Sequence, residues 1–485
     1  MSPKYEMVIG LEVHAQLSTN TKLFCGCSTK FGADVNTNVC PVCLGMPGAL
    51  PVLNRDAVTM AVQAGVALNC DIQHESVFAR KNYFYPDLPK GYQISQFELP
   101  VCLGGSLDIE VDGAVKRIGI TRIHMEEDAG KLLHQGAMGI ADSTYSLVDL
   151  NRACTPLIEI VSEPDLRSAA EARAYVETLR QILRTIGVND GNLEEGSLRV
   201  DINISLRHVG ATQFGTRCEV KNVNSFRSID RAIASEFIRQ QEVLESGGRI
   251  VQQTRNYHDD TQTTTPLRDK EDAHDYRYFP EPDLLPLLLT DERIQSIRAA
   301  MPELPHAICR RYQQGLGLTR ADADILIEEI GMRRFFEACL ACAQDISPKE
   351  ISKWVIGDLN ALLKPKGGFG PSLSLSPEYF VKLIRLISSG ALSGKMAKEM
   401  LPQLIETDQD PDVLMANLGG GQISDESTLL EIVRKVISEN LDVVEKVKSG
   451  KTASANFLMG QVMKQSQGKA KPDLVMSLIL AEINT

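Results

Sequence analysis

The chain has 485 residues, of which 43% are hydrophobic and 24% are charged, and its formal net charge at pH 7 is −12. This length exceeds what one hydrophobic core usually serves, so we expect a globular protein of several domains. The acidic balance argues against general polyanion binding, and the short, proline-broken apolar runs and the start MSPKYEMVIG argue against a membrane span and a secretory signal.

Residues 8–17, VIGLEVHAQL, alternate apolar and polar positions as a β-strand does. Because the side chains of a strand point alternately to its two faces, Glu12 and His14 should share one face while Ile9, Leu11 and Val13 pack behind it. Two interpretations are open for this polar pair: a solvated edge strand, or a metal or proton-transfer site.

Four cysteines in FCGCSTKFGADVNTNVCPVC form two close pairs on either side of a loop: Cys25, Cys27, Cys40 and Cys43. Such pairs can present four thiolates tetrahedrally, which predicts a closed, structural Zn²⁺ site; reduced cysteines or a disulfide are the alternatives. The remaining cysteines are interpreted as small apolar core residues. An odd total of eleven favours a reduced, cytoplasmic protein.

The stretch FARKNYFYPDLPKGYQISQ, residues 78–96, mixes the cations Arg80, Lys81 and Lys90 with several aromatic residues. Cations beside aromatic rings suit a phosphate or nucleotide pocket, or the end of an RNA. A surface loop with aromatic anchors is the alternative.

Acidic residues recur in three later motifs, RIHMEEDAGK, TPLIEIVSEPD and EEGSLRVD. Glu159 lies inside an apolar strand, where an ionised carboxylate is costly unless a cation or hydrogen-bond donors satisfy it. Together with Glu12 and His14 these acids could converge on Mg²⁺, which prefers oxygen ligands. Taken singly, each acid is more often part of a solvated face or a salt-bridge partner, so only their convergence would make a site. The other acids of the three motifs are Glu126, Glu127, Asp128, Glu194, Glu195 and Asp201.

The first 290 residues have the pattern of an α+β domain with a mainly antiparallel sheet. In SLRVDINISLR, residues 197–207, apolar and polar positions alternate, and residues 169–187 predict a helix that ends at Gly187. Two helical segments follow, so we expect domains at 1–290, 291–405 and 406–485.

The last segment is locally basic between Val444 and Pro472, which contains six lysines and one acid, Glu445. A nucleic-acid docking patch and an ordinary solvated helix face explain this equally well. The lysines are Lys446, Lys448, Lys451, Lys464, Lys469 and Lys471. The chain has no complete P-loop and no amidase-type nucleophile motif, so any use of ATP requires a non-Walker site.

Several long motifs in this order resemble the B subunits of tRNA-dependent amidotransferases. They are GLEVHAQL, RKNYFYPDLPKGYQISQ, HMEEDAGK, DLNRACTPLIEIVSEPD, EEGSLRVDINIS, DYRYFPEPDL and FLMGQVMKQSQGKA, and they cover essentially the whole chain.

The resemblance implies a cradle-like catalytic domain with a sheet similar to that of glutamine synthetase, then a helical domain and a helical tRNA-binding tail, both all-α. It implies ATP-dependent phosphorylation of the side-chain carboxylate of Glu-tRNA(Gln) or Asp-tRNA(Asn), followed by amidation. It also implies partners: an amidase (A) subunit that releases ammonia from glutamine, and a small (C) subunit that completes a heterotrimer.

Carried over motif by motif, the resemblance implies that His14, Glu127 and Glu159 bind Mg²⁺ and that Lys81 contacts phosphate or the acyl group. Glu12 and Asp201 are the acids implied for a second metal or water. Cys154 departs from the family, which usually has glycine there, and a positive φ at this position would strain it.

The chief alternative from another class is a non-catalytic, zinc-stabilised tRNA-binding scaffold. A free ammonia ligase of the glutamine synthetase type is a third interpretation, and the basic tail argues against it.

Overall fold

The structure is a computed structural model that describes residues 4–135, 145–269, 276–417, 426–448, 452–466, 470 and 472–484. The chain divides into two compact units, residues 1–305 and 306–485. Within the described ranges, no helix combines the length and the apolarity needed to cross a bilayer.

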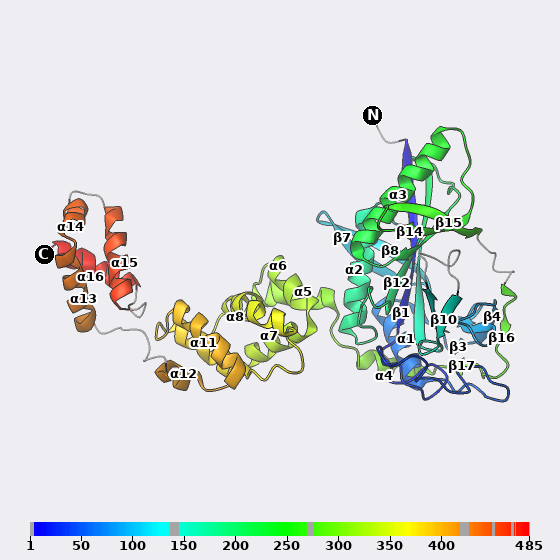
Figure 1. The fold of residues 1–485 in the computed structure, drawn as a ribbon, viewed down its shortest axis with the longest axis horizontal. Coiled ribbons are helices and arrows are strands. Elements are labelled where there is room, and N and C mark those ends of the chain that lie inside the picture. Colours follow the sequence, from blue (N-terminus) through cyan, green and yellow to red (C-terminus); the bar gives the residue numbers. More distant parts are fainter. Residues whose placement is uncertain are drawn as a thin grey trace. The chain divides into compact units, whose positions relative to one another are not determined.

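The first unit is built on one large sheet with the strand order β15-β14-β13-β12-β1-β11-β8-β6-β2, and β7 pairs with β8 (Figure 1). All of these pairings are antiparallel except β13 with β14. The strands are β1 Tyr5–Gln16, β2 Asp71–Ile72, β6 Cys102–Leu103, β7 Ser106–Val111, β8 Ala114–Glu127, β11 Pro156–Ser162, β12 Leu198–His208, β13 Cys218–Val223, β14 Gln253–His258 and β15 Thr263–Asp269. The expectation of a mainly antiparallel α+β domain is confirmed.

Helices cover the apolar face of this sheet, and the alternation of β1 explains why. Ile9, Leu11 and Val13 are buried in the hydrophobic core, as expected, whereas Glu12 and His14 lie on the opposite face. The helices α1 (Arg55–Ala67), α2 (Ala169–Thr185) and α3 (Phe226–Glu245) all contact sheet strands (Figure 1).

The helix predicted at 169–187 is confirmed as α2, and local chemistry sets both of its ends. The Ser168 hydroxyl accepts a hydrogen bond from the Glu171 N–H at 3.1 Å, which satisfies one free amide of the first turn. Gly187 adopts a φ of 73° after the last turn, a conformation that costs glycine little.

Small sheets complete the first unit. β4 (Phe78–Asn82) pairs with β5 (Tyr92–Gln96) and β16 (Phe279–Pro280), and β3 (Glu75–Ser76) pairs with β17 (Leu287–Leu288). β9 (Lys131–Gln135) and β10 (Tyr145–Asp149) pair antiparallel. Helix α4 (Asp291–Ala299) packs on α1 and contributes Ile294 and Ile297 to the core of this unit.

The second unit is helical and has two hydrophobic cores, one formed by residues from Ile308 to Leu414 and one by residues from Leu429 to Ile483. Its α-helices are α5 Pro305–Leu316, α6 Arg320–Glu328, α7 Ile330–Cys342, α8 Pro348–Trp354, α9 Asn360–Leu363, α10 Pro377–Ser388, α11 Gly394–Thr407, α12 Pro411–Asn417, α13 Glu426–Glu439, α14 Leu441–Lys448, α15 Ala455–Gln465 and α16 Pro472–Asn484. One turn of π-helix, η3 (Val355–Leu359), follows α8, and short 3₁₀ turns lie at η4 (Lys364–Lys366) and η5 (Thr452–Ser454).

Candidate active site

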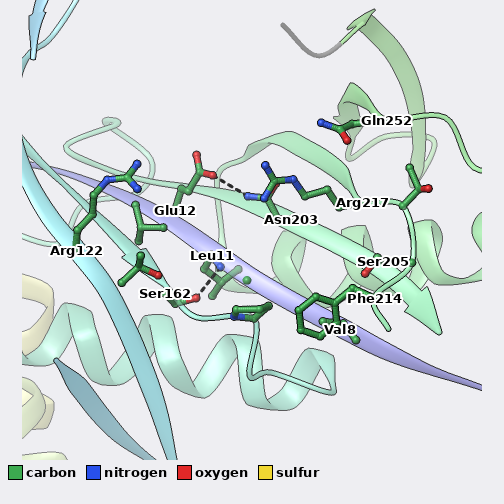
Figure 2. Close-up of a pocket in the computed structure, with 16 residues that line it drawn as sticks. Val8, Leu11, Glu12, Arg122, Ser162, Asn203, Ser205, Phe214, Arg217 and Gln252 are labelled. Carbon is green, nitrogen blue, oxygen red and sulfur yellow. Dashed lines mark hydrogen bonds between the residues drawn. The ribbon is translucent and has the colours of Figure 1, made fainter. Parts of the chain in front are cut away.

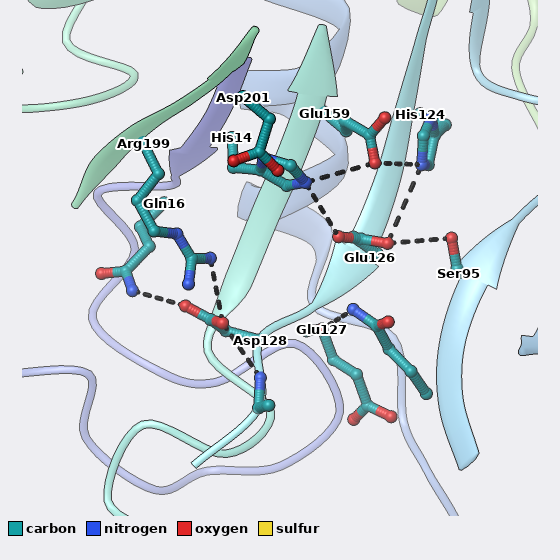
Figure 3. A network of polar contacts seen from close by, with 12 residues as sticks. His14, Gln16, Ser95, His124, Glu126, Glu127, Asp128, Glu159, Arg199 and Asp201 are labelled. Atoms are coloured by element: carbon teal, nitrogen blue, oxygen red, sulfur yellow. Dashed lines mark hydrogen bonds and ion pairs between the residues drawn. The ribbon is translucent and has the colours of Figure 1, made fainter. Parts of the chain in front are cut away.

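Two imidazoles and two carboxylates meet on the polar face of the central strands. The strand register places His14 of β1 opposite Glu159 of β11, and Glu159 opposite His124 of β8. Glu159 Oε2 lies 3.3 Å from Nε2 of both histidines. Glu126, two residues beyond His124 on the same face, completes the group at 3.8 Å from His124 Nε2 and 4.0 Å from His14 Nε2 (Figure 3).

Burial and mutual charge govern the protonation of this cluster. Burial alone would raise the pKa of the Glu159 carboxyl, but the His124 and His14 imidazoles hold that pKa well below its usual range. Burial lowers the pKa of His124, yet the Glu159 and Glu126 carboxylates together outweigh it and raise that pKa to about 9. The carboxylates are therefore ionised at neutral pH, and a divalent cation could replace the protons of the imidazoles.

Glu127 lies on the opposite face of β8 and does not join this cluster (Figure 3). Its buried carboxylate pairs with the Lys90 ammonium, with 2.6 Å between Nζ and Oε2. It also accepts hydrogen bonds from the Ile94 N–H at 2.8 Å and from the Cys154 thiol at 2.7 Å. Neighbouring residues of a strand face opposite ways, so Glu126, and not Glu127, stands with His14 and Glu159.

Asp128 follows directly after β8 and anchors the edge of the site. Its carboxylate accepts hydrogen bonds from Arg199 Nη2 at 3.0 Å and from Gln16 Nε2 at 2.7 Å. Burial would raise the pKa of Asp128, but the Arg199 guanidinium holds it below its usual value. Asp128 is thus fully occupied by protein donors.

A second acidic group lies beside the first, with Glu12, Asp201 and Glu219 each offering an oxygen within 4.8 Å of the others. Lys221 Nζ pairs with Asp201 and lies 3.1 Å from Glu219 Oε1. The sequence motifs pointed to Glu12 and Asp201, which the structure brings together, but not to Glu219. Glu219 is on β13, the strand next to β12, so only the sheet order reveals it. Glu194 and Glu195 are exposed and lie outside both groups.

Lys81 lines a cavity of about 310 Å³, which we call the acid cavity because Glu159 and Asp201 line it together with His14. Its Nζ lies 4.9 Å from the centre of the Tyr276 ring. Burial lowers the pKa of Lys81, but Glu126, Tyr278 and Glu159 together outweigh it, so the pKa is raised and the side chain is a cation. The structure thus joins Lys81 to His14 and Glu159.

A second cavity of about 610 Å³ adjoins the first and shares four lining residues with it: Glu12, Arg122, Arg217 and Gln252. Figure 2 shows the two arginines on either side of Glu12, whose Oε1 accepts a hydrogen bond from Asn203 Nδ2 at 2.9 Å. Phe214 lines the same cavity with 55% of its surface exposed. The shared residues make the two cavities one continuous surface.

The four cysteines of the two close pairs also meet. Each Sγ of Cys25, Cys27, Cys40 and Cys43 lies within 4.8 Å of the others, and all are free of disulfides. A hydrogen bond with Cys25 lowers the pKa of the Cys43 thiol to about 4, and the buried Lys22 ammonium acts in the same direction. The arrangement suits a tetrahedral metal ion.

Cys154, the departure from the family motif, has a φ of 66°. This is the left-handed region, which strains residues other than glycine. Its thiol is buried against Glu127, so the side chain takes part in the contacts that hold β8.

Three of the six tail lysines lie within the described residues. Lys446 and Lys448 end α14, and Lys464 lies in the last turn of α15. Lys451, Lys469 and Lys471 lie outside the described residues.

Comparisons with known proteins agree with the motifs over the whole chain. A family model described as the GatB/GatE catalytic domain matches residues 7–295, and one described as the GatB domain matches residues 334–483. The chain is 52% identical over 481 residues to the B subunit of the aspartyl/glutamyl-tRNA(Asn/Gln) amidotransferase of Geotalea uraniireducens, covering 99% of this chain and 100% of that protein. The proteins of the same name from Geobacter sulfurreducens and a Thermoanaerobacter species are both 51% identical to it, with 99% of this chain covered in each case. The chain therefore belongs to the family of B subunits of aspartyl/glutamyl-tRNA(Asn/Gln) amidotransferases.

Proposed function

We propose that this chain activates the side-chain carboxylate of Glu-tRNA(Gln), Asp-tRNA(Asn) or both with ATP, and that ammonia then converts the acyl phosphate to the amide. The observation that carries the proposal is the pair of adjoining cavities lined by His14 and Glu159 of the His14–Glu126–Glu159 cluster, by Lys81 and by two arginines. These cavities combine groups for holding divalent cations with groups for holding phosphates.

The donor set fits Mg²⁺ at two places. His14, Glu126 and Glu159 would hold one ion, and Glu12, Asp201 and Glu219 would hold a second. Glu126 thus takes the place that the sequence resemblance gave to Glu127. Bound Mg²⁺ would neutralise phosphate oxygens as negative charge moves onto the leaving group.

The chain's own cations would orient the reactants. Arg122 and Arg217 border both cavities and suit the bidentate binding of phosphate oxygens. Phe214 lines the second cavity and not the first, and its exposed ring suits the base of ATP. Lys81 faces the acid cluster and would bind the transferred phosphate or the acyl oxygen.

The reaction balances without a covalent enzyme intermediate. A side-chain carboxylate oxygen attacks the terminal phosphorus of ATP, and ADP leaves. Ammonia then attacks the acyl carbon, inorganic phosphate leaves, and the nitrogen loses a proton to give the neutral amide. Phosphorylation is needed because a carboxylate oxygen is a poor leaving group, whereas phosphate is a good one.

The remaining assignments concern structure and partners. The four-cysteine group would hold a structural Zn²⁺, since four protein sulfurs leave no open position for catalysis. An amidase (A) subunit would supply ammonia and a small (C) subunit would complete the complex, in the cytoplasm. The domains 1–290, 291–405 and 406–485 would serve as a glutamine synthetase-like catalytic cradle, a helical domain and a tRNA-binding tail that uses Lys446, Lys448 and Lys464.

Reconstitution with the amidase and small subunits tests the proposal. Each misacylated tRNA is incubated with ATP, Mg²⁺ and glutamine, and amidated product and ADP are measured. We expect ATP-dependent amidation that Glu159→Gln abolishes while tRNA binding persists. Activity of the Glu159→Gln complex equal to wild type would favour the scaffold alternative, and no ATP-dependent conversion of either tRNA would refute the proposal.

A further inference from the structure

Three aromatic residues form one side of the acid cavity, and we call them the aromatic wall: Phe97, Tyr276 and Tyr278. Phe97 follows β5, whereas the two tyrosines directly precede β16, so distant parts of the chain build this wall. The rings of Phe97 and Tyr278 are parallel within 5°, with centroids 4.3 Å apart. Tyr276 meets Tyr278 edge-on at 6.0 Å.

The wall leaves aromatic surface uncovered beside charged groups. Phe97 is 43% exposed, although it lines a cavity whose other residues are mostly polar. Burying this ring in the core would be favourable, so its exposure at a reactive site indicates a ligand with an apolar, planar part. Nucleobases are such ligands, since they stack on aromatic side chains.

Lys81 lines the same cavity as the aromatic wall and the Glu159 carboxylate. Its ammonium is 4.9 Å from the Tyr276 ring centre and 5.9 Å from that of Tyr83, and within the described part of the chain it has no carboxylate oxygen within ion-pair distance. The part of a ligand that adjoins a ring stacked on the wall would therefore lie near the Lys81 ammonium and the Glu126–Glu159 cluster.

We infer that the aromatic wall stacks on the terminal nucleoside of the acylated RNA, so that the esterified amino acid extends past Lys81 toward the acid cluster. The inference rests on the proposed function. The adenine of ATP has the same stacking chemistry, but no residue of the wall lines the second cavity, where Phe214, which does not line the first cavity, offers another ring for the base of ATP. We therefore assign the wall to the terminal nucleoside of the RNA.

The test uses the reconstituted complex and tRNA whose terminal adenine is replaced by 2-aminopurine, a base whose fluorescence is quenched by stacking. Phe97→Leu and Tyr278→Leu remove an aromatic face, while Tyr278→Phe keeps it. Phe84→Leu is the matched control, because Phe84 is an 85% exposed aromatic residue outside the cavity.

We expect each leucine variant to lose most of the quenching and to raise the KM for acyl-tRNA by about 5- to 150-fold, the range of one base–aromatic stack. The KM for ATP should stay within twofold of wild type. Tyr278→Phe should keep the quenching that Tyr278→Leu loses, and Phe84→Leu should behave as wild type. A merely structural role for Tyr278 would shift thermal stability and both KM values together.

Unchanged quenching and unchanged acyl-tRNA KM in both leucine variants would overturn the inference. A rise in the ATP KM alone would assign the wall to the nucleotide and would also overturn it. If the wild-type complex shows no turnover, the proposed function fails, but the fluorescence titration still decides whether the wall holds the RNA end.

Discussion

Glu126 and Glu127 are adjacent in the chain, yet the structure gives them separable roles, which two isosteric substitutions can tell apart. Glu127→Gln removes the charge that balances the buried Lys90 ammonium, whose side chain is 8% exposed against 1% for Glu127. Breaking a buried pair at one partner costs about 3–5 kcal/mol. Glutamine keeps an oxygen that can accept from the Ile94 N–H, so the lower end applies, about 3 kcal/mol.

In a unit of 305 residues, 1 kcal/mol corresponds to roughly 2 °C in Tm, so Glu127→Gln should lower the transition of this unit by about 6 °C. Glu126→Gln should change it by about 2 °C at most, because glutamine keeps the hydrogen bond from Ser95 and the ion pairs it loses are 3.8–4.0 Å long. Its effect should fall on metal binding, since it removes one carboxylate of the His14–Glu126–Glu159 group that we propose to hold Mg²⁺.

Scanning calorimetry measures the first effect, and Mn²⁺ binding followed by electron paramagnetic resonance measures the second. We expect Glu126→Gln to weaken Mn²⁺ binding by about 10-fold or more, as losses near a metal ligand do, and Glu127→Gln to leave it within about threefold. Glu98→Gln, at an exposed position, is the control for both. The reverse pattern, metal binding lost with Glu127 and stability lost with Glu126, would refute the assignment of faces on β8.

Three further outcomes follow from the structure. At Cys154, whose φ is 66°, Cys154→Gly should be more stable to urea than Cys154→Ala by about 1 kcal/mol, because only glycine is unstrained there; equal stability would contradict the backbone assignment. Purified protein should contain one zinc per chain by elemental analysis, and Cys43→Ala should lose it and lower Tm; full zinc in the variant would exclude the four-cysteine site. Burial alone would raise the pKa of the Glu236 carboxyl, but Arg239 lowers it below the usual 4.5, so this carboxylate stabilises the fold above that pH and its contribution is lost as the pH falls through the lowered pKa. Glu236→Gln should therefore flatten the loss of unfolding free energy below pH 4.5 in urea titrations, and an unchanged slope would contradict the ion pair.

Much of the local structure could be read from residue order because it depends on near neighbours. The alternation in residues 8–17 and 197–207 is enough to separate a buried face from a polar one, and the structure confirms both strands. The helix at 169–185 follows from its Ser168 cap and from Gly187. The paired cysteines could be grouped for the same reason, since their spacing limits how far apart their thiols can lie.

The composition of the site could not be read in this way, because it depends on which strands lie side by side. Glu219 joins Glu12 and Asp201 only because β13 pairs with β12 and β12 with β1. The aromatic wall exists only because the segment before β16 folds onto β4 and β5.

The choice between Glu126 and Glu127 is the clearest case. Motif matching pointed to Glu127, although the alternation of β8, with Ile123 and Met125 buried on the other face from His124, already favoured Glu126. Chain order determined that two carboxylates lie here. Tertiary structure decided that Glu126 lies beside the histidines and that Glu127 pairs with the buried Lys90, because the two faces of one strand pack against different partners.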